Sequence, residues 1–133
     1  MQQKGQELIN TILEDKYNTL CYDCKSEKNY PKYISINNGI FLCENCARIH
    51  KKWDKQYSEI IKNYLSKLDT HQLTLLVNGG NSNLRIFIDN NFPKLLYLNP
   101  EQMYKTNALQ YYRDLVINYQ LYIILVALQS IWR

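Results

Sequence analysis

The sequence predicts a small α+β domain, with a short β-sheet packed by helices. Three observations lead to this class. All four cysteines of the 133-residue chain lie between residues 21 and 46. Two short apolar runs between them have the alternation of strands, and apolar residues recur at helical spacing on both sides. A chain of this length forms one domain, with room for an appended helix.

The cysteines form two C-x-x-C pairs, Cys21 with Cys24 and Cys43 with Cys46, with eighteen residues between the pairs. This spacing is typical of zinc sites in which each pair holds the ion from one side. Two disulfides or four idle thiols are the alternatives. They are disfavoured because the N-terminal sequence MQQKGQELIN has the features of neither a signal peptide nor a transit peptide. We therefore expect one structural Zn²⁺ on these four residues, which adds stability to a small core.

The elements around the cysteines follow from residue spacing. Residues 5–20 place their apolar side chains at helical intervals. Residues 33–36 and 40–42 are predicted to be two strands, joined by the Asn-Asn-Gly turn at 37–39. The second cysteine pair then opens a helix over about residues 44–53.

The next part of the chain is predicted to be helical. Residues 60–68 carry an apolar stripe at helical spacing. Thr70 is expected to cap the following helix, which a Gly-Gly pair ends. Asn81 or Ser82 is expected to cap another, which an Asn-Asn-Phe-Pro run ends.

The last helix is expected to begin after Asn99, with Pro100 at its first position and Gln102 completing a capping-box pattern. No glycine or proline follows, so one long helix is predicted up to residue 133. Its apolar seam comprises Leu109, Tyr112, Val116, Tyr119, Ile123 and Val126.

Residues 119–133 are expected to be an apolar extension of this helix, distinct from a zinc domain at 1–118. No charged residue lies between Asp114 and Arg133, and the extension is apolar on every side. Burial against a protein partner or in an oligomer is the favoured interpretation. A membrane-spanning helix, burial within this domain and a position at a membrane interface are the alternatives.

Positive charge is concentrated after the second cysteine pair. Residues 46–67 carry six basic and two acidic side chains, an excess equal to the net charge of +4 of the whole chain. Such a stretch could meet phosphates, anionic lipid or an acidic protein, although a solvated helix surface is the favoured interpretation. No nucleic-acid partner is expected, because the aromatic residues are not interleaved with the basic ones in a stacking pattern.

Several segments together resemble the Arf GTPase-activating protein (ArfGAP) domain family, in the same order and at similar distances over about residues 5–118. They are the two cysteine pairs and residues 31–35 (PKYIS), 38–43 (NGIFLC), 46–51 (CARIHK), 79–81 (GGN) and 104–114 (YKTNALQYYRD).

The resemblance implies a treble-clef-like zinc finger on a small sheet, packed by helices. It also implies activity toward Arf-type GTPases, through an arginine that enters the GTPase site and neutralises charge on the transferred phosphoryl group. In the family this arginine finger lies five residues after the last cysteine, a position held here by Lys51. Lysine keeps the charge but not the two-pronged hydrogen bonding. Arg48 could reach in its place, although a solvated role is favoured for it.

The sequence departs from the family after this position. The family's glycine-containing loop is replaced by KWDKQ at 52–56, and Leu68 stands where the family has a tryptophan. The spacing of apolar residues over 60–68 also differs from that of the family and is typical of an amphipathic helix. We therefore expect no catalytic residue, and a structural or interaction subunit of a larger, membrane-associated assembly. A divergent but active GTPase-activating protein for an Arf-type GTPase is the alternative.

Other enzyme classes find little support. His50 and His71 have no nucleophile partner, and four cysteines already complete a tetrahedron. His50 is expected at the surface or behind the metal ligands, and His71 on the first turn of a helix. By family the protein belongs in the cytoplasm or at the periphery of a membrane, and the apolar extension leaves a mitochondrial membrane complex open.

Overall fold

The computed structural model describes residues 2–118 and has the predicted α+β class. The α-helices are α1 (Gln2–Glu14), α2 (Glu44–His50), α3 (Thr70–Asn78), α4 (Asn81–Asn91), α5 (Pro100–Tyr104) and α6 (Asn107–Ile117). The strands are β1 (Tyr33–Ser35), β2 (Ile40–Leu42) and β3 (Ile60–Lys62), and the 3₁₀ helices are η1 (Lys16–Thr19), η2 (Leu65–Lys67) and η3 (Pro93–Tyr97).

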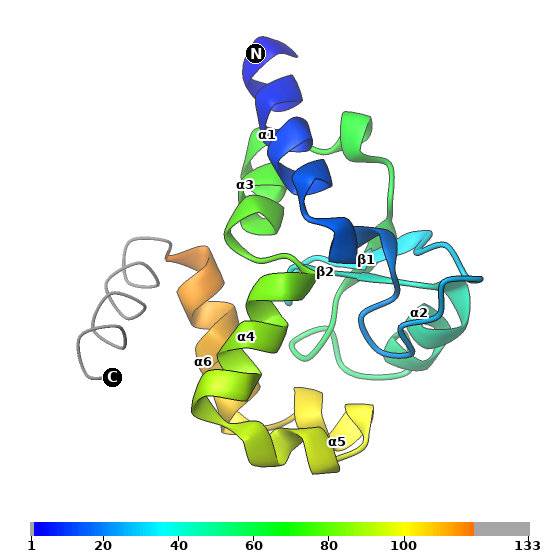
Figure 1. Cartoon of the computed structure of the whole chain (residues 1–133), viewed down its shortest axis with the longest axis vertical. Coiled ribbons are helices and arrows are strands. Elements are labelled where there is room, and N and C mark those ends of the chain that lie inside the picture. The colour runs from blue at the N-terminus through cyan, green and yellow to red at the C-terminus, as the bar shows by residue number, and fades with distance from the viewer. Residues whose placement is uncertain (1, 119–133) are drawn as a thin grey trace.

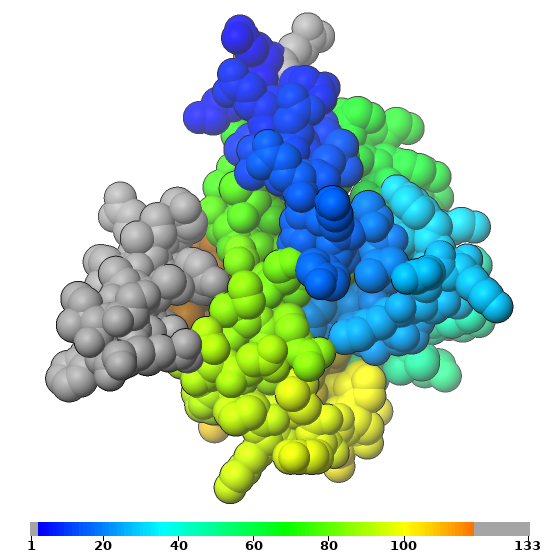
Figure 2. All heavy atoms as spheres, viewed as in Figure 1, coloured from blue at the N-terminus to red at the C-terminus, as the bar shows by residue number. Residues whose placement is uncertain are grey.

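The helices cover both faces of one small sheet. α1 packs along α3 at the N-terminal end of the molecule, and the strands and α2 lie together on one side (Figure 1). The space-filling view shows the loop between the first cysteine pair and β1, in light blue, projecting from that side (Figure 2). None of the described helices has the length and apolar character needed to cross a bilayer.

The sheet is antiparallel, in the order β2-β1-β3. Ile34 of β1 pairs with Phe41 of β2, and both point toward a core formed with α1 and α3. Ile40 and Leu42 point to the opposite face, toward a core formed with α2, α4 and α6. The strand alternation predicted between the cysteine pairs is therefore confirmed, with both faces buried.

The prediction of a helix over residues 60–68 is wrong, because this segment begins with strand β3. Ile60 and Ile61 pack against the two opposite cores, as the two-residue period of a strand requires. A short apolar run fits both periods in a sequence. Pairing with β1 decides the outcome, since it satisfies the backbone groups of an otherwise unpaired segment.

Two helix starts also differ from expectation. The cap of α3 is Asp69 rather than Thr70, and its Oδ1 accepts from the backbone N–H of Gln72 at 2.7 Å in a capping box. α4 begins at Asn81 itself, directly after Gly80, which has φ of +94°.

The predicted single last helix is two helices. Asn99 caps α5 as predicted, and its Oδ1 accepts from the backbone N–H of Gln102 at 2.8 Å. α5 ends at Tyr104, and Thr106 Oγ1 then accepts from the backbone N–H of Leu109 at 3.2 Å to start α6. A threonine cap thus separates the helices without glycine or proline. Of the predicted seam, Leu109, Tyr112 and Val116 are buried, whereas Tyr119, Ile123 and Val126 lie outside the described residues.

Candidate metal centre and the face beside it

The four predicted metal ligands are close together. The Sγ atoms of Cys21, Cys24, Cys43 and Cys46 all lie within 4.8 Å of one another, and those of Cys24 and Cys43 are 3.8 Å apart. In a tetrahedral site with Zn–S bonds of about 2.3 Å, neighbouring sulfur atoms are about 3.8 Å apart. The four side chains therefore fit one closed tetrahedral metal site.

Local structure positions each pair. In the first pair, the backbone N–H of Lys25 donates to the carbonyl of Cys21 at 2.9 Å, and Lys25 has φ of +56°. In the second pair, Cys43 is the N-cap of α2, so the first turn of that helix brings Cys46 back to the same point. Strand pairing between β1 and β2 then fixes the start of α2.

The pKa values of two of the cysteine thiols are shifted in opposite directions. A hydrogen bond from Cys46 lowers the pKa of the Cys21 thiol to about 5, and the same contact raises the pKa of Cys46. Four cysteine sulfur atoms are a soft donor set, which suits a divalent cation such as zinc once the thiols are deprotonated.

A buried chain of hydrogen bonds starts between the first two cysteines, at Asp23. Its Oδ2 lies 2.7 Å from Nε2 of His50, and its Oδ1 accepts from the hydroxyl of Tyr104 at 2.6 Å. On the other side of the imidazole, Nδ1 lies 2.7 Å from Oγ of Ser58. His50 is fully buried, so its interpretation as a surface residue is wrong; its imidazole contacts Asp23, which lies between Cys21 and Cys24.

The chain continues through the sheet to α6. Ser58 Oγ lies 2.6 Å from Ser35 Oγ, which accepts from Nδ2 of Asn38 at 2.9 Å. Arg113 of α6 donates from Nη1 to Oδ1 of Asn38 at 2.9 Å. We call these seven residues the buried polar chain; they are Tyr104, Asp23, His50, Ser58, Ser35, Asn38 and Arg113.

One set of proton positions satisfies the buried polar chain. Asn38 donates to Ser35, whose hydroxyl donates to Ser58, whose hydroxyl in turn donates to Nδ1 of His50. Nε2–H of the imidazole then donates to the Asp23 carboxylate. Each member has at least one hydrogen-bond partner, whereas Nε of Arg113 is buried without one among residues 2–118.

Arg113 is a buried cation without a carboxylate partner among the described residues. Its Nη1 also contacts the carbonyl oxygens of Tyr57 and Tyr104 at 3.3 Å and 3.2 Å, and its Nη2 donates to Oε1 of Gln110 at 3.2 Å. Burial lowers the pKa of Arg113. Neutral oxygens from three elements therefore stabilise its charge and tie α6 to the loop before β3.

Asn37 forms hydrogen bonds to the backbone of the loop between α2 and β3. Nδ2 of Asn37 donates to the carbonyl of Lys55 at 3.0 Å, and its Oδ1 accepts from the backbone N–H of Glu59 at 2.8 Å. Trp53 is buried, with its ring centroid 4.2 Å from that of His50. This loop therefore has a defined conformation and a side chain inserted in the core.

Lys51 lies at the start of this loop, directly after the buried His50. Its side chain is exposed, and its Nζ lies 4.4 Å from the centroid of the Tyr33 ring. Arg48, one turn earlier on α2, is also exposed. His71 lies on the first turn of α3 as predicted.

The Gly-Gly-Asn segment at 79–81 connects three elements through close packing and hydrogen bonds. Gly79 lies so close to Gly39 that a Cβ on it would be 3.2 Å from Gly39 Cα. Oδ1 of Asn81 accepts from the backbone N–H of Phe41 at 2.9 Å, and its Nδ2 donates to the carbonyls of Tyr17 and Leu20. This asparagine thus joins η1, β2 and α4 beside the first cysteine pair.

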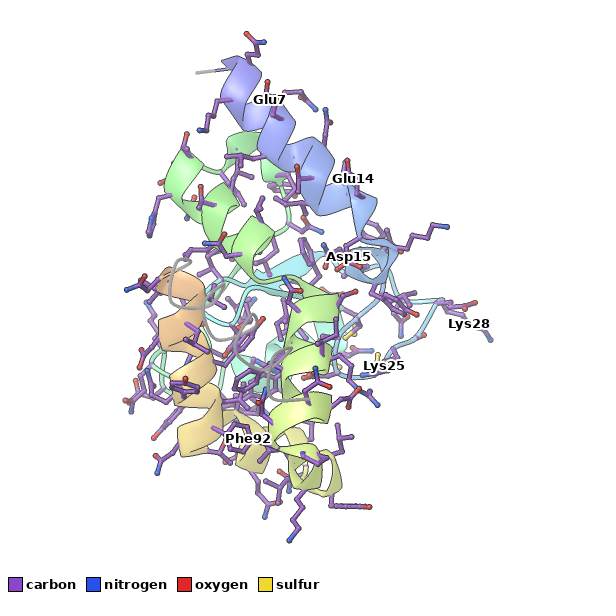
Figure 3. All side chains as sticks on the ribbon, turned by 60° about the vertical axis from the view of Figure 1, so that its left-hand side comes forward. Glu7, Glu14, Asp15, Lys25, Lys28 and Phe92 are labelled. Atoms are coloured by element: carbon purple, nitrogen blue, oxygen red, sulfur yellow. The ribbon has the colours of Figure 1, made fainter. Side chains whose placement is uncertain are left out.

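A cavity of about 400 Å³ lies on the other side of the first cysteine pair. Tyr22, Arg85 and Ile86 are among its lining residues, with Lys25 at its edge. Figure 3 shows Lys25 between α4 and the loop that carries Lys28. No residue of α2 or of the loop after it lines this cavity, so it is separate from the face around Lys51.

The ArfGap family model, described as "Putative GTPase activating protein for Arf", matches residues 6–119. The chain belongs to this family. The resemblance stated from the cysteine spacing and the segments around it is therefore confirmed, and the ArfGAP fold accounts for the α+β class.

Relatives and solved structures agree. Stromal membrane-associated protein 1 of Homo sapiens is 26% identical over 94 residues, 71% of this chain and 20% of its own length. The ADP-ribosylation factor GTPase-activating protein effector protein 2 of Saccharomyces cerevisiae is 30% identical over 80 residues, 60% of this chain and 26% of its own. This ArfGAP chain thus spans about a quarter or less of the length of these relatives.

A solved structure described as a "putative GTPase activating protein for ADP ribosylation factor" from Cryptosporidium parvum has a TM-score of 0.66 and 21% identity. The match covers 87% of this chain and 90% of that one. At this identity the likeness concerns the ArfGAP fold alone.

Sequence reasoning found the cysteine cluster of this ArfGAP domain but missed most of the buried polar chain. Asp23 and Tyr104 are 81 residues apart, and no local spacing connects them. One signal was present: Asp23 lies between two of the cysteines, and His50 follows the second pair by four residues.

Proposed function

We propose that the chain is a catalytically degenerate ArfGAP-family module that acts as a structural or interaction subunit of a larger assembly. One structural Zn²⁺ on Cys21, Cys24, Cys43 and Cys46 holds the module together. The observation that carries the proposal is Lys51, which occupies the position of the family's arginine finger. An Arf-type GTPase remains a candidate partner by family.

A lysine at this position is not expected to stimulate GTP hydrolysis as much as an arginine finger does. An arginine finger contributes about 10³- to 10⁵-fold to GTP hydrolysis, through a planar fork that a lysine ammonium lacks. The Nζ of Lys51 also contacts the ring of Tyr33 in its own sheet. Its charge therefore already has a partner within the domain.

The loop after Lys51 gives further support. Trp53 is inserted against His50, and Asn37 holds the loop backbone at two points. A loop fixed in this way cannot rearrange around a GTPase without losing these contacts. The replacement of a glycine-containing loop therefore favours a scaffold over a catalyst.

A divergent but active GTPase-activating protein is the second candidate. Residues 60–62 form the edge strand β3 and not the helix expected from sequence. The expected helix was one reason to infer that the catalytic face is lost, and that reason no longer applies. The buried polar chain also fixes His50, the residue directly before Lys51.

The test is GTP hydrolysis by an Arf-type GTPase in the presence of the wild-type chain, Lys51→Ala and Lys51→Arg. We expect the wild type and Lys51→Ala to leave the intrinsic rate unchanged. We expect Lys51→Arg to raise it, by up to about 10³-fold, because the scaffold around this position is intact. Stimulation by the wild type that Lys51→Ala abolishes would establish the second candidate instead. Stimulation that depends on Arg48 would assign the finger to that residue.

We further propose that residues 1–118 form the domain and that 119–133 supply the contact to the partner assembly, which lies at a membrane. The support is the charge-free run between Asp114 and Arg133, together with Ile117, which is 63% exposed at the end of α6. Proteins that copurify with the full chain should be lost when the chain ends at Asn118. Retention of the same proteins by the shortened chain would contradict this role.

A further inference from the structure

Lysine and tyrosine side chains contact one another from the end of α2, across the start of β1, to the segment that follows β3. Lys51 Nζ lies 4.4 Å from the ring centroid of Tyr33, and Tyr33 is the cross-strand partner of Lys62. Lys62 and Lys67 place their Nζ atoms 6.0 Å and 5.4 Å from the ring centroid of Tyr64. We call these five residues the lysine–tyrosine row.

The ammonium groups of the row are not neutralised by acids of the domain. The ion pairs among residues 2–118 join Asp23 with His50, Asp89 with Arg85, and Glu101 with Lys105. None of them includes a lysine of the row. The neutral rings stabilise these lysines without cancelling their charge, so the row is an uncompensated positive surface.

Along the sequence, aromatic and basic residues are not interleaved in a stacking pattern, so no nucleic-acid partner is expected. In space they are interleaved, but in a way that disfavours base stacking. The rings of Tyr33 and Tyr64 each have an ammonium group over them from the domain itself. A base would have to displace that group to reach the ring. The charges, rather than the rings, therefore face a ligand.

The three charges come from separate elements and do not converge on one point. Lys51 caps α2, Lys62 is on the edge strand β3, and Lys67 is in η2. Exposed aromatic surface accompanies Lys62 and Lys67, because the Tyr64 ring beneath their Nζ atoms is 53% exposed. An extended surface of negative charge with an apolar layer behind it complements this arrangement better than a small anion does.

We propose that the lysine–tyrosine row is a docking surface for the headgroups of a bilayer that contains acidic phospholipids. The ammonium groups contact phosphate and carboxylate oxygens, and the tyrosines occupy the interfacial layer, where such side chains are favoured. This role goes beyond the proposed function and rests on its assignment of Lys51 as a residue that does not enter a GTPase site.

The test uses the full chain and phosphatidylcholine vesicles with or without phosphatidylserine. The row variant is Lys51→Gln, Lys62→Gln and Lys67→Gln combined. The control removes the same charge from other exposed positions, as Lys4→Gln, Lys28→Gln and Lys94→Gln combined. Zinc content and circular dichroism establish that each variant is folded.

We expect flotation of the wild type with phosphatidylserine vesicles, weakened by added salt. The row variant should lose about 100-fold in affinity, at about fivefold for each lysine, and the control variant should lose much less. Equal losses in the two variants, or no difference between the two kinds of vesicle, would overturn the proposal. So would tighter binding of a single-stranded oligonucleotide through the same three lysines.

Discussion

The imidazole of His50 and the carboxylate of Asp23 are joined by a hydrogen bond of 2.7 Å, although 27 residues separate them in the chain. Asp23 lies between the first two cysteines, and His50 ends α2, directly before Lys51. The metal centre and the face around Lys51 are therefore connected through this hydrogen bond. A metal that fixes the first cysteine pair also fixes where α2 ends.

This relationship predicts a large loss of stability in Asp23→Ala. The substitution leaves Nε2–H of His50 and the hydroxyl of Tyr104 without their acceptor in a buried site. We expect a loss of about 3 to 5 kcal/mol in the free energy of unfolding, measured by denaturant titration of the zinc-loaded chain.

The matched control for Asp23→Ala is Glu27→Ala, which removes an exposed acid from the same loop. Its effect should stay within about 0.5 kcal/mol. If the two variants unfold at the same denaturant concentration, the buried polar chain does not stabilise the fold in the way described.

Arg113→Met should destabilise the domain and increase the local opening of the loop before β3. The substitution leaves the oxygens of Asn38, Tyr57 and Tyr104 without their shared donor. We expect a loss of about 2 to 4 kcal/mol, and faster amide hydrogen exchange at residues 54–59 than in the wild type. Arg85→Met removes an exposed cation of α4 and serves as the control. Unchanged exchange in this loop would show that other contacts hold it.

The sequence was sufficient to predict the cysteine cluster, strands β1 and β2, and the α+β class, because each depends on spacing within a short segment. The strand β3 was missed, since residues 60–68 satisfy a helical period as well as a strand period. Only the pairing with β1 distinguishes a strand from a helix in this segment. That pairing joins Ile61 to Ile34, about 27 residues earlier in the chain.

The break between α5 and α6 was missed for a different reason. Thr106 ends one helix and caps the next, and its hydroxyl both donates to the carbonyl of Met103 and accepts from the N–H of Leu109. A single threonine, here between Lys105 and Asn107, is a weak signal, because threonine also occurs within helices. Most of the buried polar chain was also missed, since its members are spread from residue 23 to residue 113 of the sequence.

Metal removal should unfold the domain. Four sulfur atoms at tetrahedral spacing close the junction between η1, the loop before β1 and α2. We expect one zinc per chain by elemental analysis and a loss of helical circular dichroism on chelation, restored by added Zn²⁺. Cys43→Ser, at a buried ligand position, should have the same effect as chelation. A thermal midpoint that is identical with and without chelator would exclude a structural metal.

The two glycines Gly39 and Gly5 should respond to alanine in opposite directions. Gly39 has φ of +63°, and a Cβ on it would lie 3.3 Å from Gly79 Cα and 3.4 Å from the carbonyl oxygen of Leu75. Gly39→Ala should therefore destabilise the domain by about 1 to 3 kcal/mol. Gly5 lies within α1, where a Cβ would meet only Leu73 Cδ1 at 4.0 Å, so Gly5→Ala should stabilise it by about 0.5 to 1 kcal/mol. Thermal unfolding of both variants with zinc bound measures the two shifts. A Gly39→Ala variant as stable as Gly5→Ala would contradict the close packing of the turn after β1 against α3.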